Sequence, residues 1–80
     1  MNPVRRALDR WKKSNPKGTV QQFAEALGYK QADTVYRLLR DEFIPPVERL
    51  KTIAEFAAWP LGRVTTYFAE NVPQLKRRTG

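Results

Sequence analysis

The sequence predicts a compact, all-α domain of five short helices. Its apolar residues recur at helical spacing in five successive segments, and no stretch alternates polar and apolar residues with a period of two. Proline, glycine and capping residues separate these segments at short intervals. A chain of 80 residues is the size of one domain. We therefore expect one helical domain over residues 1–70 and a basic tail over residues 71–80.

The first expected helix has a clear start and a clear end. Asn2 suits the N-cap position and Pro3 suits the first helical position. The segment 14–18, Ser-Asn-Pro-Lys-Gly, has the composition of a loop and ends the helix. Between them the apolar residues fall on one stripe, at Val4, Ala7, Leu8 and Trp11.

The second expected helix begins with a capping box formed by Thr19 and Gln22. Its apolar stripe comprises Val20, Phe23, Ala24 and Leu27. Gly28 then suits the left-handed position that ends many helices. Because this helix has only about two turns, packing against neighbours must stabilise it.

The third expected helix runs from Gln31 or Asp33 to Arg40, and both starts are open from the sequence. Asp33 favours the later start because aspartate is a good N-cap residue. The apolar side of this helix comprises Val35, Leu38 and Leu39.

Prolines delimit the last two expected helices. Pro45 stops the preceding segment and Pro46 can start the fourth helix, while Pro60 is expected to end it and to lie in the first turn of the fifth. The fourth stripe comprises Val47, Leu50, Ile53, Ala54 and Ala57, and the fifth comprises Leu61, Val64 and Phe68.

Composition narrows the function classes. The net charge is +7, with the excess in residues 1–17 and 71–80, which suits a polyanionic partner. The chain has no cysteine and no histidine, and it has no glycine-rich phosphate loop. We expect no metal, no cofactor, no small-molecule ligand and no enzymatic activity. Since no apolar run is long enough to span a membrane and no signal peptide is apparent, we expect a cytoplasmic bacterial protein.

The join between the second and third helices carries a resemblance to a known family. Ala24 is small enough for a close helix approach, and Gly28 permits a sharp turn four residues later. With the segments "TVQQFAEALG", "TVYRLL" and "PPVERLKTIAEFAAWPLGRV", the chain resembles the lambda-repressor-like helix-turn-helix family over residues 4–68. That family includes phage repressors, Cro proteins and many bacterial regulators. The turn "GYKQADTV" is one residue longer than the family's usual spacing.

The resemblance implies that the third helix enters the major groove of DNA. With Val35 facing the core, a polar arc faces outward, and we expect it to read base edges. Its residues are Asp33, Thr34, Tyr36, Arg37 and Arg40. We expect phosphate contacts from Lys17, Thr19, Gln21, Gln22 and Lys30. Gln21 or Gln22 would replace the phosphate-contacting glutamine that many family members carry at the position of Val20.

The function implied is a sequence-specific transcriptional regulator of double-stranded DNA, a Cro-like phage repressor that blocks polymerase at its operator. The alternative is an antitoxin-type protein-interaction module that also binds DNA. We expect a homodimer on a palindromic operator, formed through Tyr67, Val72 and Leu75, since these apolar residues exceed what the core needs. The competing interpretation is that they cover the protein's own helices.

Overall fold

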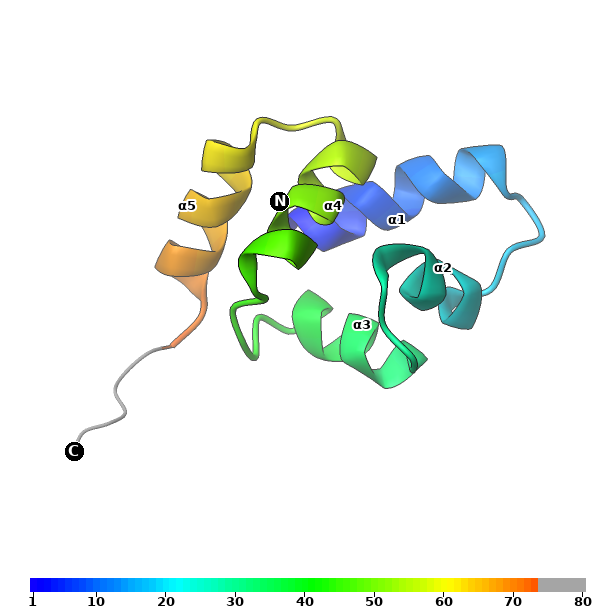
Figure 1. Ribbon diagram of the computed structural model, residues 1–80, viewed down its shortest axis with the longest axis horizontal. Coiled ribbons are helices and arrows are strands. Elements are labelled where there is room, and N and C mark those ends of the chain that lie inside the picture. The colour runs from blue at the N-terminus through cyan, green and yellow to red at the C-terminus, as the bar shows by residue number, and fades with distance from the viewer. Residues whose placement is uncertain (74–80) are drawn as a thin grey trace.

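The structure is a computed structural model that describes residues 1–73. These residues form five α-helices joined by short loops (Figure 1). They are α1 (Pro3–Ser14), α2 (Val20–Leu27), α3 (Ala32–Leu39), α4 (Val47–Ala57) and α5 (Leu61–Asn71). No strand occurs in these residues, which confirms the all-α prediction. None of the helices within 1–73 has the length and apolar character needed to span a membrane.

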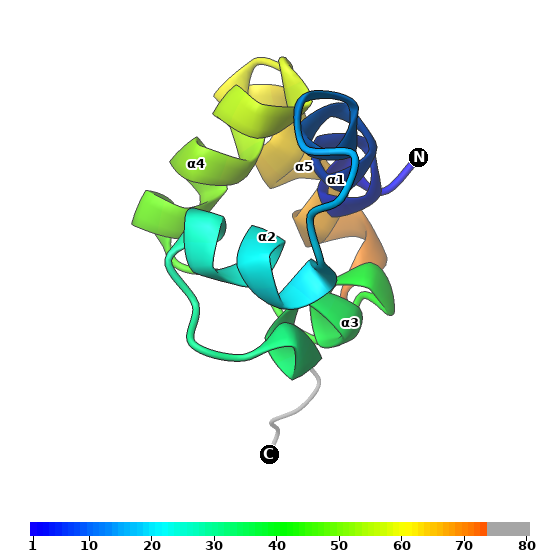
Figure 2. The same ribbon diagram turned by 90° about the vertical axis from the view of Figure 1, so that its right-hand side faces the viewer.

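The helices enclose one apolar core. α1 packs along α4, α2 packs against α3, and α5 closes the core against α4. The largest fully buried side chains are Phe23 and Phe68, which come from α2 and α5. In both views α3 lies along the lower side of the molecule, away from the α4–α5 connection at the top (Figures 1 and 2). One side of α3 is therefore left outside the core.

Side-chain capping begins α1 and α2 as the sequence predicts. The Asn2 Oδ1 atom accepts hydrogen bonds from the backbone N–H groups of Val4 and Arg5, at 2.7 and 3.1 Å. In the capping box, the Gln22 N–H donates to Thr19 Oγ1 at 3.1 Å, and the Thr19 N–H donates to Gln22 Oε1 at 2.9 Å. Both helix starts are thus fixed by residues within one turn of them.

The start of α3 does not follow the Asp33 prediction. The helix begins at Ala32 with Gln31 as N-cap, and the Gln31 side chain makes no capping hydrogen bond. Asp33 lies in the first turn, where its negative charge is favourable near the helix N-terminus. The N-cap role for Asp33 is therefore wrong. The reason is tertiary, because the Ala32 N–H donates to Gln21 Oε1 of α2 at 3.0 Å.

The end of α4 also differs from expectation. The helix stops at Ala57, before Pro60, with Ala58 in the left-handed region at φ 56°. Two arginines of α1 occupy carbonyls at this end: Arg6 Nε donates to Ala57 O at 2.6 Å and Arg10 Nε donates to Phe56 O at 3.2 Å. Pro60 acts only as the N-cap residue of α5.

Candidate nucleic-acid interface

The joint between α2 and α3 depends on a glycine. Gly28 has φ 101°, and the next N–H, of Tyr29, donates back to Ala24 O at 2.9 Å. Arg49 of α4 donates through Nη2 to Gly28 O at 3.0 Å, and a Cβ atom on Gly28 would lie 2.8 Å from Arg49 Cζ. Glycine suits this position because of its left-handed backbone, while the Arg49 guanidinium, the far end of a flexible side chain, could shift away from a Cβ atom. Ala24 is fully buried beside this turn.

Gln21 connects α2 to the turn and to α3. Its Nε2 donates to Lys30 O at 2.8 Å and to Glu25 Oε2 at 3.0 Å, while its Oε1 accepts from the Ala32 N–H. All these bonds lie within the protein and use both ends of the side-chain amide. Gln21 therefore sets how α3 leaves the turn, a role that the sequence did not indicate.

The outer side of α3 gathers the residues expected to read bases. Val35 and Leu38 are fully buried and fix the rotation of the helix. The other side presents Asp33, Tyr36, Arg37 and Arg40 as exposed residues, with Thr34 half-buried. The structure thus brings all five predicted residues to one polar surface, which we call the α3 face.

The two arginines of the α3 face share one carboxylate. Arg37 Nε lies 3.1 Å from Glu42 Oε1, and Arg40 Nε lies 2.6 Å from Glu42 Oε2. The Arg37 guanidinium also lies 5.5 Å from the centre of the Phe43 ring. Hydrogen bonds from Arg40 and then Arg37 lower the pKa of Glu42 below its ordinary value. Glu42 is therefore ionised at neutral pH and bonded to both cations.

The chain reaches Glu42 through an unusual residue. Asp41 has φ 59°, a left-handed conformation that is uncommon outside glycine. Its Oδ1 atom accepts from Asn2 Nδ2 at 3.0 Å and from the Tyr67 hydroxyl at 2.9 Å. Burial, followed by this bond to Asp41, raises the pKa of Tyr67. The end of α3 is thus tied to the start of α1 and to α5.

The predicted phosphate-contacting residues lie at the start of α2 and in the loops around it. Lys17 is exposed in the α1–α2 loop, and Lys30 is exposed in the α2–α3 turn. Thr19 and Gln22 are exposed as well, with their capping atoms engaged in the capping box. Lys12, which was not predicted to be involved, donates to Gly18 O at 2.9 Å and so braces this loop.

Part of the N-terminal basic charge lies away from the α3 face. Arg6 and Arg10 are bonded at the C-terminal end of α4, which lies opposite α3 in Figure 1. Cations are stabilised there by the helix dipole. These two arginines therefore have a structural role that the charge distribution of the sequence could not reveal.

The residues expected to form a dimer contact have other neighbours. Val72 is 6% exposed and belongs to the core, so the prediction that it exceeds the needs of the core is wrong. Tyr67 is half-buried and bonded to Asp41, and Leu75 lies outside the described residues. The packed structure accordingly continues past residue 70, where the sequence placed the domain end.

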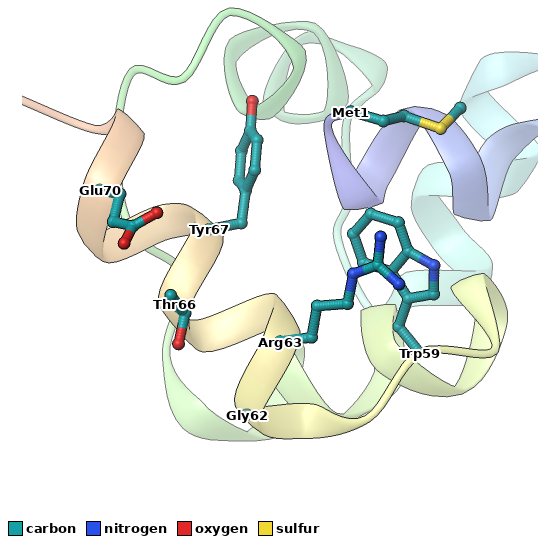
Figure 3. Close-up of a pocket in the computed structure, with 7 residues that line it drawn as sticks. All are labelled: Met1, Trp59, Gly62, Arg63, Thr66, Tyr67 and Glu70. Atoms are coloured by element: carbon teal, nitrogen blue, oxygen red, sulfur yellow. The ribbon is translucent and has the colours of Figure 1, made fainter.

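An open hollow of about 370 Å³ lies beside α5. Its lining comprises Met1, Trp59, Gly62, Arg63, Thr66, Tyr67 and Glu70 (Figure 3). The Arg63 guanidinium stacks over the Trp59 ring with Cζ 3.8 Å from the ring centre.

Residues 1–73 contain no group of three or more carboxylate, histidine or cysteine side chains that could hold a metal ion.

Comparisons with protein families, curated proteins and solved structures found no match to this chain.

Proposed function

We propose that the protein is a sequence-specific transcriptional regulator that binds double-stranded DNA through a lambda-repressor-like helix-turn-helix formed by α2 and α3. In this proposal α3 is the recognition helix and enters the major groove. Repression by blocking polymerase at the operator is the simplest mechanism for a protein of this size.

One observation carries the proposal: a short, tightly turned helix pair presents a polar, arginine-bearing side of α3 outside the core. Gly28 and buried Ala24 make the turn, and Val35 with Leu38 holds the rotation of α3. The helix has eight residues and lies along one side of the molecule, so its charged, exposed side could enter a groove.

The side chains of the α3 face suit base edges. Arginine can donate two parallel hydrogen bonds to guanine O6 and N7, a role for Arg37 and Arg40. Asp33 can accept from cytosine N4, and Tyr36 or Thr34 can contact a thymine methyl group or a phosphate. Lys17 and Lys30, on either side of α2, would contact phosphates and set the register of α3 in the groove.

We further propose that two copies bind a palindromic operator, because one recognition helix covers only part of a helical turn. Since Val72 is committed to the core, the contact between copies would involve other surface than the sequence suggested. Sedimentation of the operator DNA saturated with protein measures how many copies of the protein bind to it. A complex of one protein per palindrome would rule out the dimer.

The deciding experiment selects sites from a pool of randomised DNA duplexes and then measures binding at several salt concentrations. We expect an enriched sequence and an affinity that falls steeply as salt rises, because phosphate contacts release counterions. No enrichment, or no binding even at low salt, would refute the proposal.

Matched arginine variants assign the helix. Arg37→Ala and Arg40→Ala should each weaken binding to the selected site by about 1–3 kcal/mol, as expected for loss of a bidentate base contact. Arg10→Ala removes the same charge at the far end of α4 and should leave the sequence preference unchanged. If all three variants bind alike, α3 is not the recognition helix. Thermal melting of each variant verifies that it is folded.

A further inference from the structure

We propose that Glu42 is a specificity-determining residue that positions Arg37 and Arg40 for base contact, an inference that rests on the DNA-binding function proposed above. Glu42 lies outside α3 and is not among the residues expected to contact bases. Its role would be to hold the two arginines in one arrangement before DNA arrives.

The atoms used in these contacts support positioning. Glu42 bonds the Nε atom of each arginine, at 3.1 Å for Arg37 and 2.6 Å for Arg40. A guanidinium has five N–H donors, so a carboxylate at Nε leaves terminal N–H groups available. Those terminal groups can make the bidentate contact with guanine. The carboxylate thus occupies the side of each guanidinium that base readout does not need.

Arg37 is restrained on a second side. Its guanidinium lies 5.5 Å from the centre of the Phe43 ring, within the range of a cation–π contact. The side chains of Arg37 and Arg40 nevertheless remain 51% and 58% exposed. They are restrained and accessible at the same time, which is what a pre-organised binding group requires.

The backbone conformation at Asp41 places Glu42 beside the C-terminal end of α3. Because Asp41 is left-handed, the chain folds back after Arg40, and the Glu42 N–H donates to Arg37 O at 3.1 Å. The bonds of Asn2 and Tyr67 to the Asp41 carboxylate hold that conformation. Residues from α5 and from the start of α1 therefore fix the position of the carboxylate that holds the arginines.

A carboxylate beside DNA also has a cost, because it repels phosphates. Glu42 should therefore lower the affinity for DNA in general, and on the correct sequence its positioning of the two arginines should offset that loss. Positioning therefore differs from simple competition between Glu42 and DNA for the arginines. Simple competition would weaken binding to every DNA sequence by the same factor.

The test measures two affinities for each variant at one salt concentration: for the duplex selected from the random pool, and for a scrambled duplex of equal length and composition. Glu42→Gln removes the charge and keeps the shape. We expect it to lower the ratio of the two affinities by roughly fivefold or more. Binding to the scrambled duplex should be unchanged or tighter. Glu55→Gln, an equal charge change at an exposed site on α4, should leave the ratio unchanged.

A variant cycle shows whether Glu42 acts through the arginines. In a chain carrying Arg37→Ala and Arg40→Ala, adding Glu42→Gln should no longer change the ratio. In the free protein, the Nε–H resonances of Arg37 and Arg40 should be protected from exchange in the wild type and lose that protection in Glu42→Gln. Thermal melting verifies that each variant is folded.

One result would overturn the positioning role while leaving the DNA-binding function intact. It is an unchanged ratio of the two affinities in Glu42→Gln, whether neither affinity changes or both rise by the same factor. If instead the wild-type protein enriches no sequence from the pool, the DNA-binding function fails and this role fails with it.

Discussion

Replacing Asn2 tests how strongly the start of α1 is tied to the end of α3. The side-chain amide of Asn2 forms hydrogen bonds both at the start of α1 and at the end of α3. The Oδ1 atom caps α1, while Nδ2 donates to Leu38 O and to Asp41 Oδ1, each at 3.0 Å. Asn2→Ala removes all these bonds. Asn2→Ser keeps an oxygen suited to the cap and removes only the donor that reaches α3.

The expected losses follow from these contacts. Loss of the cap costs about 1 kcal/mol. Each lost hydrogen bond to α3 costs roughly 0.5–1.5 kcal/mol, with the charged Asp41 acceptor toward the upper end. We therefore expect Asn2→Ala to lower the free energy of unfolding by about 2–4 kcal/mol, and Asn2→Ser by about 1–3 kcal/mol. For a domain of this size, each kcal/mol lowers Tm by roughly 4–8 °C.

Urea denaturation followed by circular dichroism measures both variants against the wild type. The m-value must stay constant for the comparison to report stability alone. If Asn2→Ser is as stable as the wild type, the bonds from Nδ2 to α3 contribute nothing and the tie between the helices is refuted. If the serine and alanine variants lose the same amount, the capping role is refuted.

Four further predictions concern the turn, the packing and the ion group at the end of α3. Gly28→Ala should cost about 1–2 kcal/mol in urea denaturation because of its left-handed backbone and the nearby Arg49, whereas Gly62→Ala, where a Cβ meets nothing within 4 Å, should be neutral or stabilising. Tyr29→Phe should raise Tm slightly, because its buried hydroxyl has no hydrogen-bond partner within residues 1–73. Ala24→Leu should lower stability by about 1–3 kcal/mol through overpacking, and an unchanged Tm would contradict the close helix approach. Because two arginines lower the pKa of Glu42, the ionised carboxylate stabilises the fold at pH values above the ordinary carboxyl pKa. This stabilisation is lost as the pH falls through the lowered pKa of Glu42. Denaturation at a series of acidic pH values should therefore show a smaller loss of stability in Glu42→Gln than in the wild type.

Helix boundaries were predictable where the capping group lies within the same turn. Asn2, the pair Thr19 and Gln22, and Gly28 all act as the sequence indicated, since their capping partners are two to four residues away. The rotation of α3 followed in the same way, because Val35 and Leu38 are spaced to face one core. The DNA-binding role of the opposite side stays a prediction.

The boundaries that sequence reasoning left open or missed depend on distant partners. The start of α3 is set by Gln21, eleven residues before Ala32, and the end of α4 is capped by Arg6, fifty-one residues before Ala57. No local pattern in the sequence encodes either contact. Val72 was misassigned for a related reason, because an apolar residue after the last helix gives no sign of whether it folds back onto the core.

Glu42 was missed because its spacing is not helical. It follows Arg37 by five residues and Arg40 by two, whereas ion pairs within a helix form at three or four. The contact exists only because Asp41, which is not a glycine, adopts a left-handed conformation. A signal for that conformation would require knowing beforehand that Asn2 and Tyr67 meet at the Asp41 carboxylate.

The placement of the cations changes what the net charge of +7 implies for DNA binding. Arg6 and Arg49 donate to carbonyls at helix ends, of α4 and α2 respectively, and Arg37 and Arg40 share the charge of Glu42. The salt dependence of binding counts the phosphates that are neutralised, and the total charge of the protein does not enter it directly. We therefore expect a shallower dependence than the basic composition suggests, governed by exposed lysines near α2 such as Lys17 and Lys30. The opposite result is a dependence of affinity on salt so steep that every basic residue must contact a phosphate. The arginines at the helix ends would then have to leave their carbonyls on binding, and DNA would destabilise the C-terminal ends of α2 and α4.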